Sequence, residues 1–294
     1  YLFNINGDIR EGKLQVFWSY STLHYKDETV ENVSHTFLQK LQDIIPHCLL
    51  DKNIPDYTMS DFPDFEPYVI VNNSKNEAKN NLFIFPPGHG GSESYFNNIV
   101  PELNNKNLIL FNNYYNYFEN KIDKNYLNYI TIENLARDYI IYIKLLQPEG
   151  PYNLFGWSLG GTLAFEVAKQ LIKKRELVTN IILIDPYFNL KEAVLKIGKN
   201  FEDVTHVNYK YFPAPTSDLS KTNITLFKAS KIEDAMEDEK GFFKYYVENT
   251  KYNHLDKLIK NTKIRVIKMH AGHSSWINND TEIVKICNVI KSLI

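Results

Sequence analysis

The sequence predicts an α/β fold in which helices cover both faces of a mostly parallel β-sheet. Two observations carry this prediction. From Tyr68 onward, short apolar runs alternate with long amphipathic ones, which is the pattern of parallel strands linked by helices. The chain is also long enough to bury a large core, because 44% of its 294 residues are hydrophobic and 23% are charged.

Seven apolar runs are predicted strands, and amphipathic helices fall between them. The runs are, in order, "PYVIV", "NLFIF", "LILFN", "YNLFG", "NIILID", "NITLF" and "IRVIKM". The clearest helix has Thr131 as its N-cap and ends before Pro148, with one apolar stripe. The last helix is predicted to be capped near Asn279 or Asp280, and its inward stripe is Ile283, Ile286, Cys287 and Ile290.

Residues 1–65 follow a different pattern and are predicted to be a small α+β segment. The run "GKLQVFWSYS" alternates like a half-buried strand of a hairpin, and a helix follows with Asp27 as its N-cap and Pro46 at its end. One hairpin and one helix bury too little surface to make a domain. We therefore expect this segment to pack on something else or to be poorly ordered, with "IPDYTMSDFPDFEP" as the linker to a main domain at 66–294.

Charge and composition narrow the classes of partner. The net charge is −2, and both signs are spread along the chain, so electrostatics gives no reason to expect nucleic acid or an anionic membrane. No apolar run approaches the roughly 18 residues of a membrane span, and no secretory signal is visible, so a cytoplasmic protein is expected. Cys48 and Cys287 are far apart, with no CxxC pair and no clustered His, so neither a disulfide nor a metal site is predicted.

The stretch "PYNLFGWSLGGTLAFEVAKQL" places three of the chain's 12 glycines around Ser158. A buried strand precedes this serine and an amphipathic helix follows it, which is the context of a G-x-S-x-G elbow. In such a turn the hydroxyl stands at the carboxyl edge of the sheet, and small neighbours at Gly156 and Gly160 let strand and helix approach. The alternative is a glycine-rich helix start that serves close packing alone.

A nucleophilic serine needs a base, and the base needs an acid that orients it. Asp185 ends the strand "NIILID" and would reach the same sheet edge as Ser158. Asp234, after "NITLF", is the second candidate for the acid, although it lies in an acidic run.

The base is predicted to come from "IRVIKMHAGHSSW", after the last strand. His273 follows a glycine in a loop and is better placed than His270, which is expected to be a strand-end residue. His89 precedes the serine, against the Ser, Asp, His order of this kind of site, and is interpreted as a loop residue near it.

An oxyanion formed on the substrate would need two backbone N–H donors. One is predicted at Leu159, directly after the serine. The other is predicted at Gly88 in "FIFPPGHGGSESYF", where two prolines stiffen the turn after an early strand.

Residues 66–294 resemble the thioesterase domains that end nonribosomal peptide synthetases. The residues that carry the resemblance are "LFIFPPGHGGSESYF", "QPEGPYNLFGWSLGGTLAFEVAKQL", "NIILIDPY", "NITLFKAS" and "AGHSSWI", in the family's order and spacing. The resemblance implies an α/β-hydrolase fold and a helical lid at about 186–222. The lid and its flanks hold aromatic residues that would suit a hydrophobic acyl chain or serve packing equally well: Tyr187, Phe188, Tyr209, Tyr211 and Phe212.

The resemblance also implies roles for the residues of the elbow and its partners. It makes Ser158, Asp185 and His273 a catalytic triad, with Gly88 and Leu159 as the oxyanion donors. The glycines that build the elbow are Gly156, Gly160 and Gly161.

Residues 1–65 are similar to the C-terminal tail of a condensation or epimerization domain, with the epimerization branch favoured. The matching stretches are "INGDIREGKLQVFWSYS", "LQDIIPHC" and "YTMSDFP". Synthetases of this kind normally place a carrier domain directly before the thioesterase, and no carrier-like segment is found here.

The resemblance implies a chain-terminating thioesterase that works through an acyl-Ser158 intermediate and releases a peptide by hydrolysis or macrocyclisation. The expected partners are a carrier protein, whose phosphopantetheine presents the substrate, and the rest of a multidomain synthetase. We expect no cofactor and no metal bound by this chain, and a monomer. The alternatives are a stand-alone editing thioesterase or carboxylesterase, and a non-catalytic docking module for a carrier protein.

Overall fold

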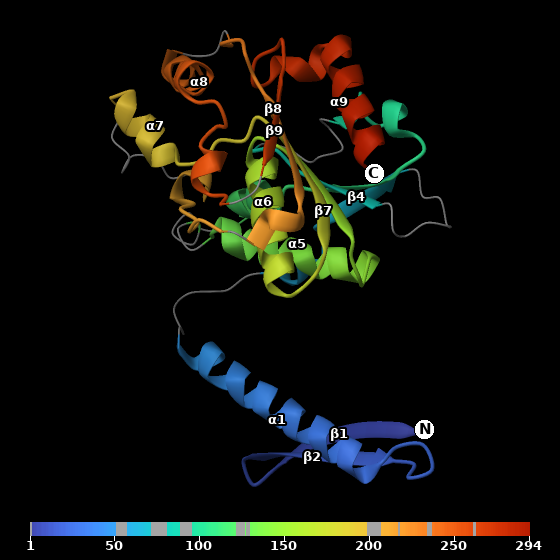
Figure 1. The fold of residues 1–294 in the computed structure, drawn as a ribbon. Helices are drawn as coiled ribbons and strands as arrows, with labels where there is room; N and C mark the ends of the chain where they lie inside the picture. The colour runs from blue at the N-terminus through green and yellow to red at the C-terminus, as the bar shows by residue number, and fades with distance from the viewer. Residues whose placement is uncertain are drawn as a thin grey trace. The chain divides into compact units, whose positions relative to one another are not determined.

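The computed structural model divides into two compact units, Tyr1–Asp56 and Tyr57–Ile294, and each is described by itself (Figure 1). The residues that the structure describes are 2–50, 58–71, 81–88, 96–121, 127, 130–198, 207–216, 218–233, 237–260 and 263–294.

The first unit is a β-hairpin and one helix. Strands β1 (Phe3–Arg10) and β2 (Lys13–Tyr20) pair antiparallel. Glu11 and Gly12 between them both have positive φ, 52° and 73°, as a two-residue hairpin turn of the favoured twist requires. Helix α1 (Asp27–Leu50) follows, and the edge of the Trp18 ring meets Phe37 of that helix with ring centroids 5.7 Å apart.

The expectation that Pro46 ends this helix is wrong, because α1 continues to Leu50. Proline removes one backbone hydrogen bond, but its fixed φ is close to that of a helix, so the backbone can pass through it.

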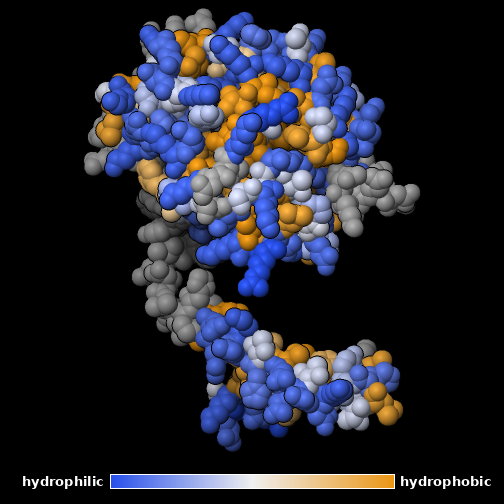
Figure 2. All heavy atoms as spheres, in the orientation of Figure 1, coloured by the Kyte–Doolittle hydropathy of each residue, from blue (hydrophilic) through white to orange (hydrophobic). Residues whose placement is uncertain are grey.

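The first unit has almost no core of its own. Among its described side chains, Val30 is the one buried hydrophobic residue, whereas Ile9 is 75% exposed and Leu14 is 54% exposed. Figure 2 shows apolar side chains on the visible surface of this unit.

The second unit is built on a seven-stranded sheet with the order β3-β5-β4-β6-β7-β8-β9. Strand β3 is antiparallel to β5, and every other neighbouring pair is parallel. All seven predicted strands are present, and the α/β prediction is confirmed. The strands are β3 (Tyr68–Val71), β4 (Asn81–Phe85), β5 (Asn107–Phe111), β6 (Tyr152–Trp157), β7 (Val178–Ile184), β8 (Asn223–Lys228) and β9 (Ile264–Lys268).

Successive residues of the central strands point into two different cores. On β7, Ile181 and Leu183 join the core under α5 (Ile132–Leu146) and α6 (Leu159–Lys173), while Ile182 and Ile184 join the core under α9 (Asp280–Leu293). Helices therefore cover both faces of the sheet, as Figure 1 shows.

The described helices also include α3 (Tyr114–Lys121), α7 (Leu190–Lys196) and α8 (Glu237–Asn249). Short 3₁₀ turns are η1 (Met59–Asp61), η3 (Pro101–Leu103), η5 (Val207–Lys210), η6 (Asp218–Lys221), η7 (Leu255–Lys257) and η8 (Ser275–Asn278).

Two predicted helix caps are confirmed. The Thr131 hydroxyl accepts a hydrogen bond of 3.1 Å from the N–H of Asn134, and the Asn279 side chain accepts one of 3.3 Å from the N–H of Glu282. Both satisfy backbone donors that a helix start leaves unpaired.

Residues 58–65 belong to the second unit and contribute side chains to its core. Met59 is buried in the α5–α6 core, and the ring of Phe65 lies 5.4 Å from that of Tyr114. The contacts thus divide the chain after Asp56, nine residues before the boundary expected at residue 65. These apolar residues within "IPDYTMSDFPDFEP" are the physical reason, because a free linker would leave them in water.

Candidate functional site

Ser158 occupies a sharp turn between β6 and α6. Its backbone has φ 55° and ψ −122°, a conformation that residues with a side chain rarely adopt. Hydrogen bonds fix the turn on both sides: the N–H of Ser158 donates to the carbonyl of Ile184 at 3.0 Å, and its carbonyl accepts from Gly161 at 3.0 Å. The serine side chain therefore stands where β6 ends, at the carboxyl edge of the sheet.

The glycines around the serine allow backbone to touch backbone. A Cβ at Gly156 would lie 2.0 Å from the carbonyl oxygen of Gly160, and one at Gly160 would lie 2.4 Å from the carbonyl oxygen of Phe85. At Gly161, a Cβ would meet Pro186 at 2.8 Å. Any larger residue at these positions would push α6 away from the strands.

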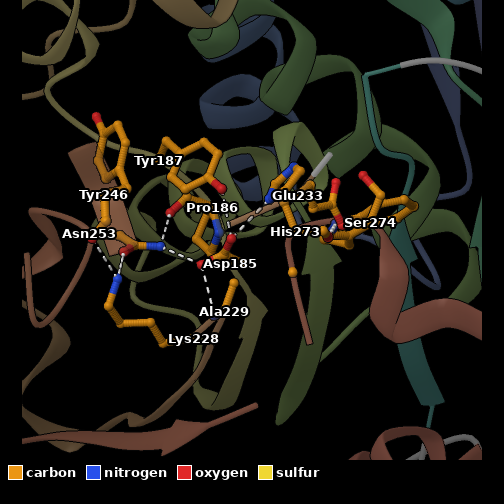
Figure 3. A network of polar contacts seen from close by, with 12 residues as sticks. Asp185, Pro186, Tyr187, Lys228, Ala229, Glu233, Tyr246, Asn253, His273 and Ser274 are labelled. Atoms are coloured by element: carbon orange, nitrogen blue, oxygen red, sulfur yellow. Dashed lines mark hydrogen bonds and ion pairs between the residues drawn. The ribbon is translucent and has the colours of Figure 1, made fainter. Parts of the chain in front are cut away.

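Asp185 follows β7 directly, and its buried carboxylate accepts four hydrogen bonds (Figure 3). One carboxylate oxygen, Oδ2, accepts from Nδ1 of His273 at 2.9 Å and from the Tyr187 hydroxyl at 2.7 Å. The other oxygen, Oδ1, accepts from the N–H of Ala229 at 3.1 Å and from the Asn253 amide at 2.8 Å.

The pKa of Asp185 lies below its ordinary value of 3.8. Burial by itself raises this pKa, but the hydrogen bond and charge of His273, together with the hydrogen bonds from Tyr187 and Asn253, outweigh it. The carboxylate is therefore ionised at neutral pH although it is buried.

Several contacts fix His273, which is only 8% exposed. Its carbonyl accepts a hydrogen bond of 2.9 Å from the Trp157 indole, and its ring stacks on Tyr187 and on Phe243, with centroids 4.7 and 5.3 Å away. The Glu233 carboxylate accepts from the backbone N–H groups that follow His273 (Figure 3).

The three predicted triad residues come from loops at one edge of the sheet. Ser158 follows β6, Asp185 follows β7, and His273 lies five residues after the end of β9. Because these strands are parallel, their carboxyl ends meet at the same edge.

The alternatives for base and acid are placed as follows. His270 is exposed, and its N–H donates to Glu282 of α9 at 2.9 Å. Its backbone is therefore bonded to a helix that covers the opposite face of the sheet from α6. Asp234 and His89 lie outside the residues that the structure describes.

The predicted oxyanion donors lie next to the elbow. Leu159 is buried and opens α6. Gly88 is half-buried in the loop after β4, whose path is fixed by a hydrogen bond of 2.7 Å from the Asn113 amide to the carbonyl of Pro87. The contact between Gly160 and Phe85 brings this loop and the start of α6 together.

The described parts of the predicted lid, 186–198, 207–216 and 218–222, contain α7, η5 and η6. Tyr187, Phe188 and Tyr211 are buried in the protein, and Phe212 is 53% exposed. The Tyr211 hydroxyl donates to the buried Glu166 of α6 at 2.6 Å, which anchors this segment to the core. The side chain of Tyr209 lies outside the described residues.

Sequence reasoning missed three parts of the site. Helix α8 brings Phe243 against His273, although the lid was expected to end before this helix. Asn253 and Lys228 hold the far side of Asp185. Lys228 left a weak signal, since it is a charged residue at the end of an apolar strand, whereas Asn253 lies in a loop without any motif.

A comparison with family models identifies residues 80–231 as a thioesterase domain. The chain belongs to the thioesterase domain family. It is therefore a hydrolase of this class, and the predicted resemblance of residues 66–294 is confirmed.

The curated relatives of this thioesterase domain include peptide synthases. It is 36% identical over 239 residues to N-(5-amino-5-carboxypentanoyl)-L-cysteinyl-D-valine synthase of Amycolatopsis lactamdurans, a match that covers 78% of this chain and 6% of that protein. The synthase of the same name from Penicillium chrysogenum is 34% identical over 219 residues, a match that covers 71% of this chain and 6% of that protein. Tyrocidine synthase 3 of Brevibacillus parabrevis is 31% identical over 131 residues, which is 45% of this chain and 2% of that protein. The chain thus spans 6% of the length of the first two relatives.

Solved structures share the fold. The NocB thioesterase domain from the nocardicin cluster matches with a TM-score of 0.52 and 14% identity over 77% of this chain and 98% of that one. The four-domain nonribosomal peptide synthetase AB3403 matches with a TM-score of 0.54 and 20% identity, over 79% of this chain and 21% of that one.

The residues that the structure describes contain no helix that is long and apolar enough to cross a bilayer. They also contain no group of three or more His, Cys, Asp or Glu side chains that could hold a metal ion.

Proposed function

We propose that this thioesterase releases a peptidyl chain from a phosphopantetheine thioester through an acyl-Ser158 intermediate. The observation that carries the proposal is the His273–Asp185 pair, buried at the sheet edge where the strained elbow presents Ser158. The relatives are large peptide synthases of which the chain matches a small part, which supports a carrier protein and a multidomain synthetase as its partners.

In the proposed first step, Nε2 of His273 takes the proton of the Ser158 hydroxyl as its oxygen attacks the thioester carbonyl carbon. Asp185 accepts from Nδ1–H, so it fixes the tautomer in which Nε2 is free to accept that proton. The N–H groups of Gly88 and Leu159 are assigned to the oxyanion. When the tetrahedral intermediate collapses, the C–S bond breaks and the thiol leaves with the proton from His273.

In the second step, His273 removes a proton from the nucleophile that attacks the oxoester. Water gives a free acid, and an amine or hydroxyl of the acyl chain gives a ring. Serine leaves with its proton restored. Which nucleophile enters depends on how the residues above the site exclude water and fold the acyl chain.

Intact-protein mass spectrometry with a peptidyl thioester mimic tests the proposal. The wild type should gain the mass of the acyl group transiently, and Ser158→Ala should not. A product lighter than the acid by one water identifies cyclisation. A folded wild type that neither forms an adduct nor turns over any thioester would contradict the proposal, and turnover of simple esters alone would indicate a carboxylesterase.

The acid of the triad is tested by a pair of variants. Asp185→Ala should lose far more activity than Asp234→Ala, because Asp185 is the carboxylate that contacts His273. We expect a loss of about 10³- to 10⁴-fold in kcat, the size found when a triad acid is disabled. The reverse order of the two variants in a thioester hydrolysis assay would refute the assignment.

A further inference from the structure

The oxygen of Asp185 that faces away from His273 is held by a buried amide. Asn253 is 0% exposed, and its Nδ2 donates to Oδ1 of Asp185 at 2.8 Å and to the carbonyl of Pro186 at 3.0 Å. With the N–H of Ala229 also donating to Oδ1, this side of the carboxylate has two fixed donors. The carboxylate is thereby prevented from turning away from the histidine.

A buried lysine lies behind the amide, as Figure 3 shows. Nζ of Lys228 donates to Oδ1 of Asn253 at 2.6 Å, to the carbonyl of Tyr246 at 2.9 Å and to the Thr250 hydroxyl at 3.4 Å. These three acceptors are neutral. Burial lowers the pKa of the Lys228 ammonium below its ordinary value, and the charge of the Asp185 carboxylate, one amide away, acts in the opposite direction.

The lysine also determines which way the amide points. An ammonium group can only donate hydrogen bonds, so the atom of Asn253 that faces Lys228 must be the oxygen. The NH₂ group then necessarily faces Asp185. Because a cation on the carbonyl oxygen polarises the amide, its N–H bonds become stronger donors to the carboxylate.

The backbone at this point is unusual. Asn253 and His254 both have positive φ, 50° and 63°. Asparagine is among the few residues with a side chain that tolerate this region. A strained backbone is kept only where the surrounding contacts fix it, and here it places the amide between the lysine and the carboxylate.

We propose that Lys228 and Asn253 are positioning residues that act through Asp185 on His273. The Asn253 amide, polarised by the Lys228 ammonium, donates to Oδ1 of Asp185. The other carboxylate oxygen, Oδ2, therefore stays aligned with Nδ1 of His273. This inference rests on the proposed function, since it assigns the pair to the same triad.

The test compares two variants with two matched controls. Asn253→Ala removes the amide, and Lys228→Met removes the charge at nearly constant size. Lys268→Met is the control for the lysine, because Lys268 pairs with Lys228 in register on the neighbouring strand and is exposed. Asn180→Ala is the control for the asparagine.

Asn180 is a suitable control because its amide is also buried and hydrogen bonded through both its nitrogen and its oxygen, but it lies at the opposite edge of the sheet. Its amide donates to Asn153 at 2.7 Å and accepts from Asn223 at 3.1 Å, near the amino ends of β6, β7 and β8. Its loss should lower stability without moving the triad.

Two readouts are measured on the whole chain. The first is kcat and KM for a thioester mimic, below the melting temperature of every variant. The second is the low-field ¹H resonance of the His273 Nδ1 proton in protein labelled with ¹⁵N-histidine, assigned with His273→Gln. This resonance reports the hydrogen bond to Asp185 whether or not the protein turns over substrate.

We expect Asn253→Ala and Lys228→Met to lower kcat by about 10- to 100-fold, as small displacements of a catalytic group do, with KM little changed. Both should shift or broaden the Nδ1 resonance. The two controls should keep kcat and the resonance of the wild type.

An unchanged resonance in both test variants, or equal losses of kcat in Asn180→Ala and Asn253→Ala, would overturn the proposal. Lys228→Gln, which keeps a polar end group, replaces Lys228→Met where the latter does not fold. If none of the test variants folds, the pair serves stability alone and the proposal fails. A wild type with the resonance but without thioester turnover would contradict the proposed function and leave the resonance as the test of positioning.

Discussion

Ser158 holds a backbone conformation that favours glycine, with φ 55° and ψ −122°. Such strain costs on the order of 1–3 kcal/mol and is retained where the rest of the structure supports it. At this position the strain exposes the hydroxyl at the end of β6 and turns the chain directly into α6. The residue that performs the proposed chemistry is therefore one that stability alone would not select.

Ser158→Gly should consequently be more stable than Ser158→Ala. Both variants lack the hydroxyl, but only glycine relieves the strain. After the entropy that glycine loses on folding is subtracted, we expect a gain of about 1 kcal/mol. Thermal melts of the two variants side by side measure this difference, and equal melting temperatures would show that the elbow is not strained.

Asp185 should make the stability of the protein depend on pH in the acid range. Its pKa in the folded protein is lowered below 3.8. Between the folded and the unfolded pKa of this group, the unfolded chain therefore binds more protons than the folded one. Its contribution to the free energy of unfolding is complete above the unfolded pKa and is lost as the pH falls through the folded pKa.

Asp185→Asn should therefore flatten the acid limb of the stability curve. Urea unfolding as a function of pH measures this change, with Asp218→Asn, an exposed carboxylate on η6, as the control. A curve for Asp185→Asn that falls as steeply as that of the wild type would show that this carboxylate does not gain its pKa shift from folding.

The meeting of β6 and α6 depends on the absence of side chains at the elbow. Gly156→Ala would place a methyl group 2.0 Å from the carbonyl oxygen of Gly160, which is backbone and cannot swing away. We expect a loss of about 3 kcal/mol or more. Gly241→Ala is the control, because Gly241 lies in α8 and the one described atom that its Cβ would approach belongs to Ile197, at 4.0 Å.

The control should move in the opposite direction. Alanine in a helix interior is favoured over glycine by about 0.5–1 kcal/mol, so Gly241→Ala should raise the free energy of unfolding. Chemical denaturation of the two variants measures both effects. Similar stabilities for Gly156→Ala and the wild type would mean that α6 can shift away from the sheet without cost.

Elements whose signals are local were predictable from the sequence. The strand "NLFIF" is buried at every position, and Thr131 and Asn279 cap their helices through bonds to residues three positions away. The order of the strand ends also predicts which edge holds Ser158, Asp185 and His273.

Contacts that form only in the tertiary fold could not be predicted from local sequence patterns. Asn253 reaches Asp185 across 68 positions from a loop without a motif, and Phe243 meets His273 only because α8 packs over that edge. The continuation of α1 through Pro46 was also missed, because a local rule about proline was applied where the backbone accommodates it.

The two units differ in how they hold themselves together. All members of the three core clusters among the described residues lie between Met59 and Ile294. Among the side chains described in the first unit, Val30 is the one buried hydrophobic residue, and Phe17 and Phe37 are about half exposed, at 47% and 40%. A unit of this size with so small a core gains too little from burial to offset its conformational entropy.

Residues 57–294 contain the described core clusters, so this unit alone should melt cooperatively and react with a fluorophosphonate at Ser158. Residues 1–56 alone should show no cooperative transition in calorimetry, and the amides of β1 and β2 should exchange with solvent at rates near those of an unfolded chain. Absence of a cooperative transition for residues 57–294 alone would show that these core clusters are not sufficient for folding. A sharp transition for residues 1–56 would show that their hairpin and helix are sufficient to fold, against the argument from their exposed side chains.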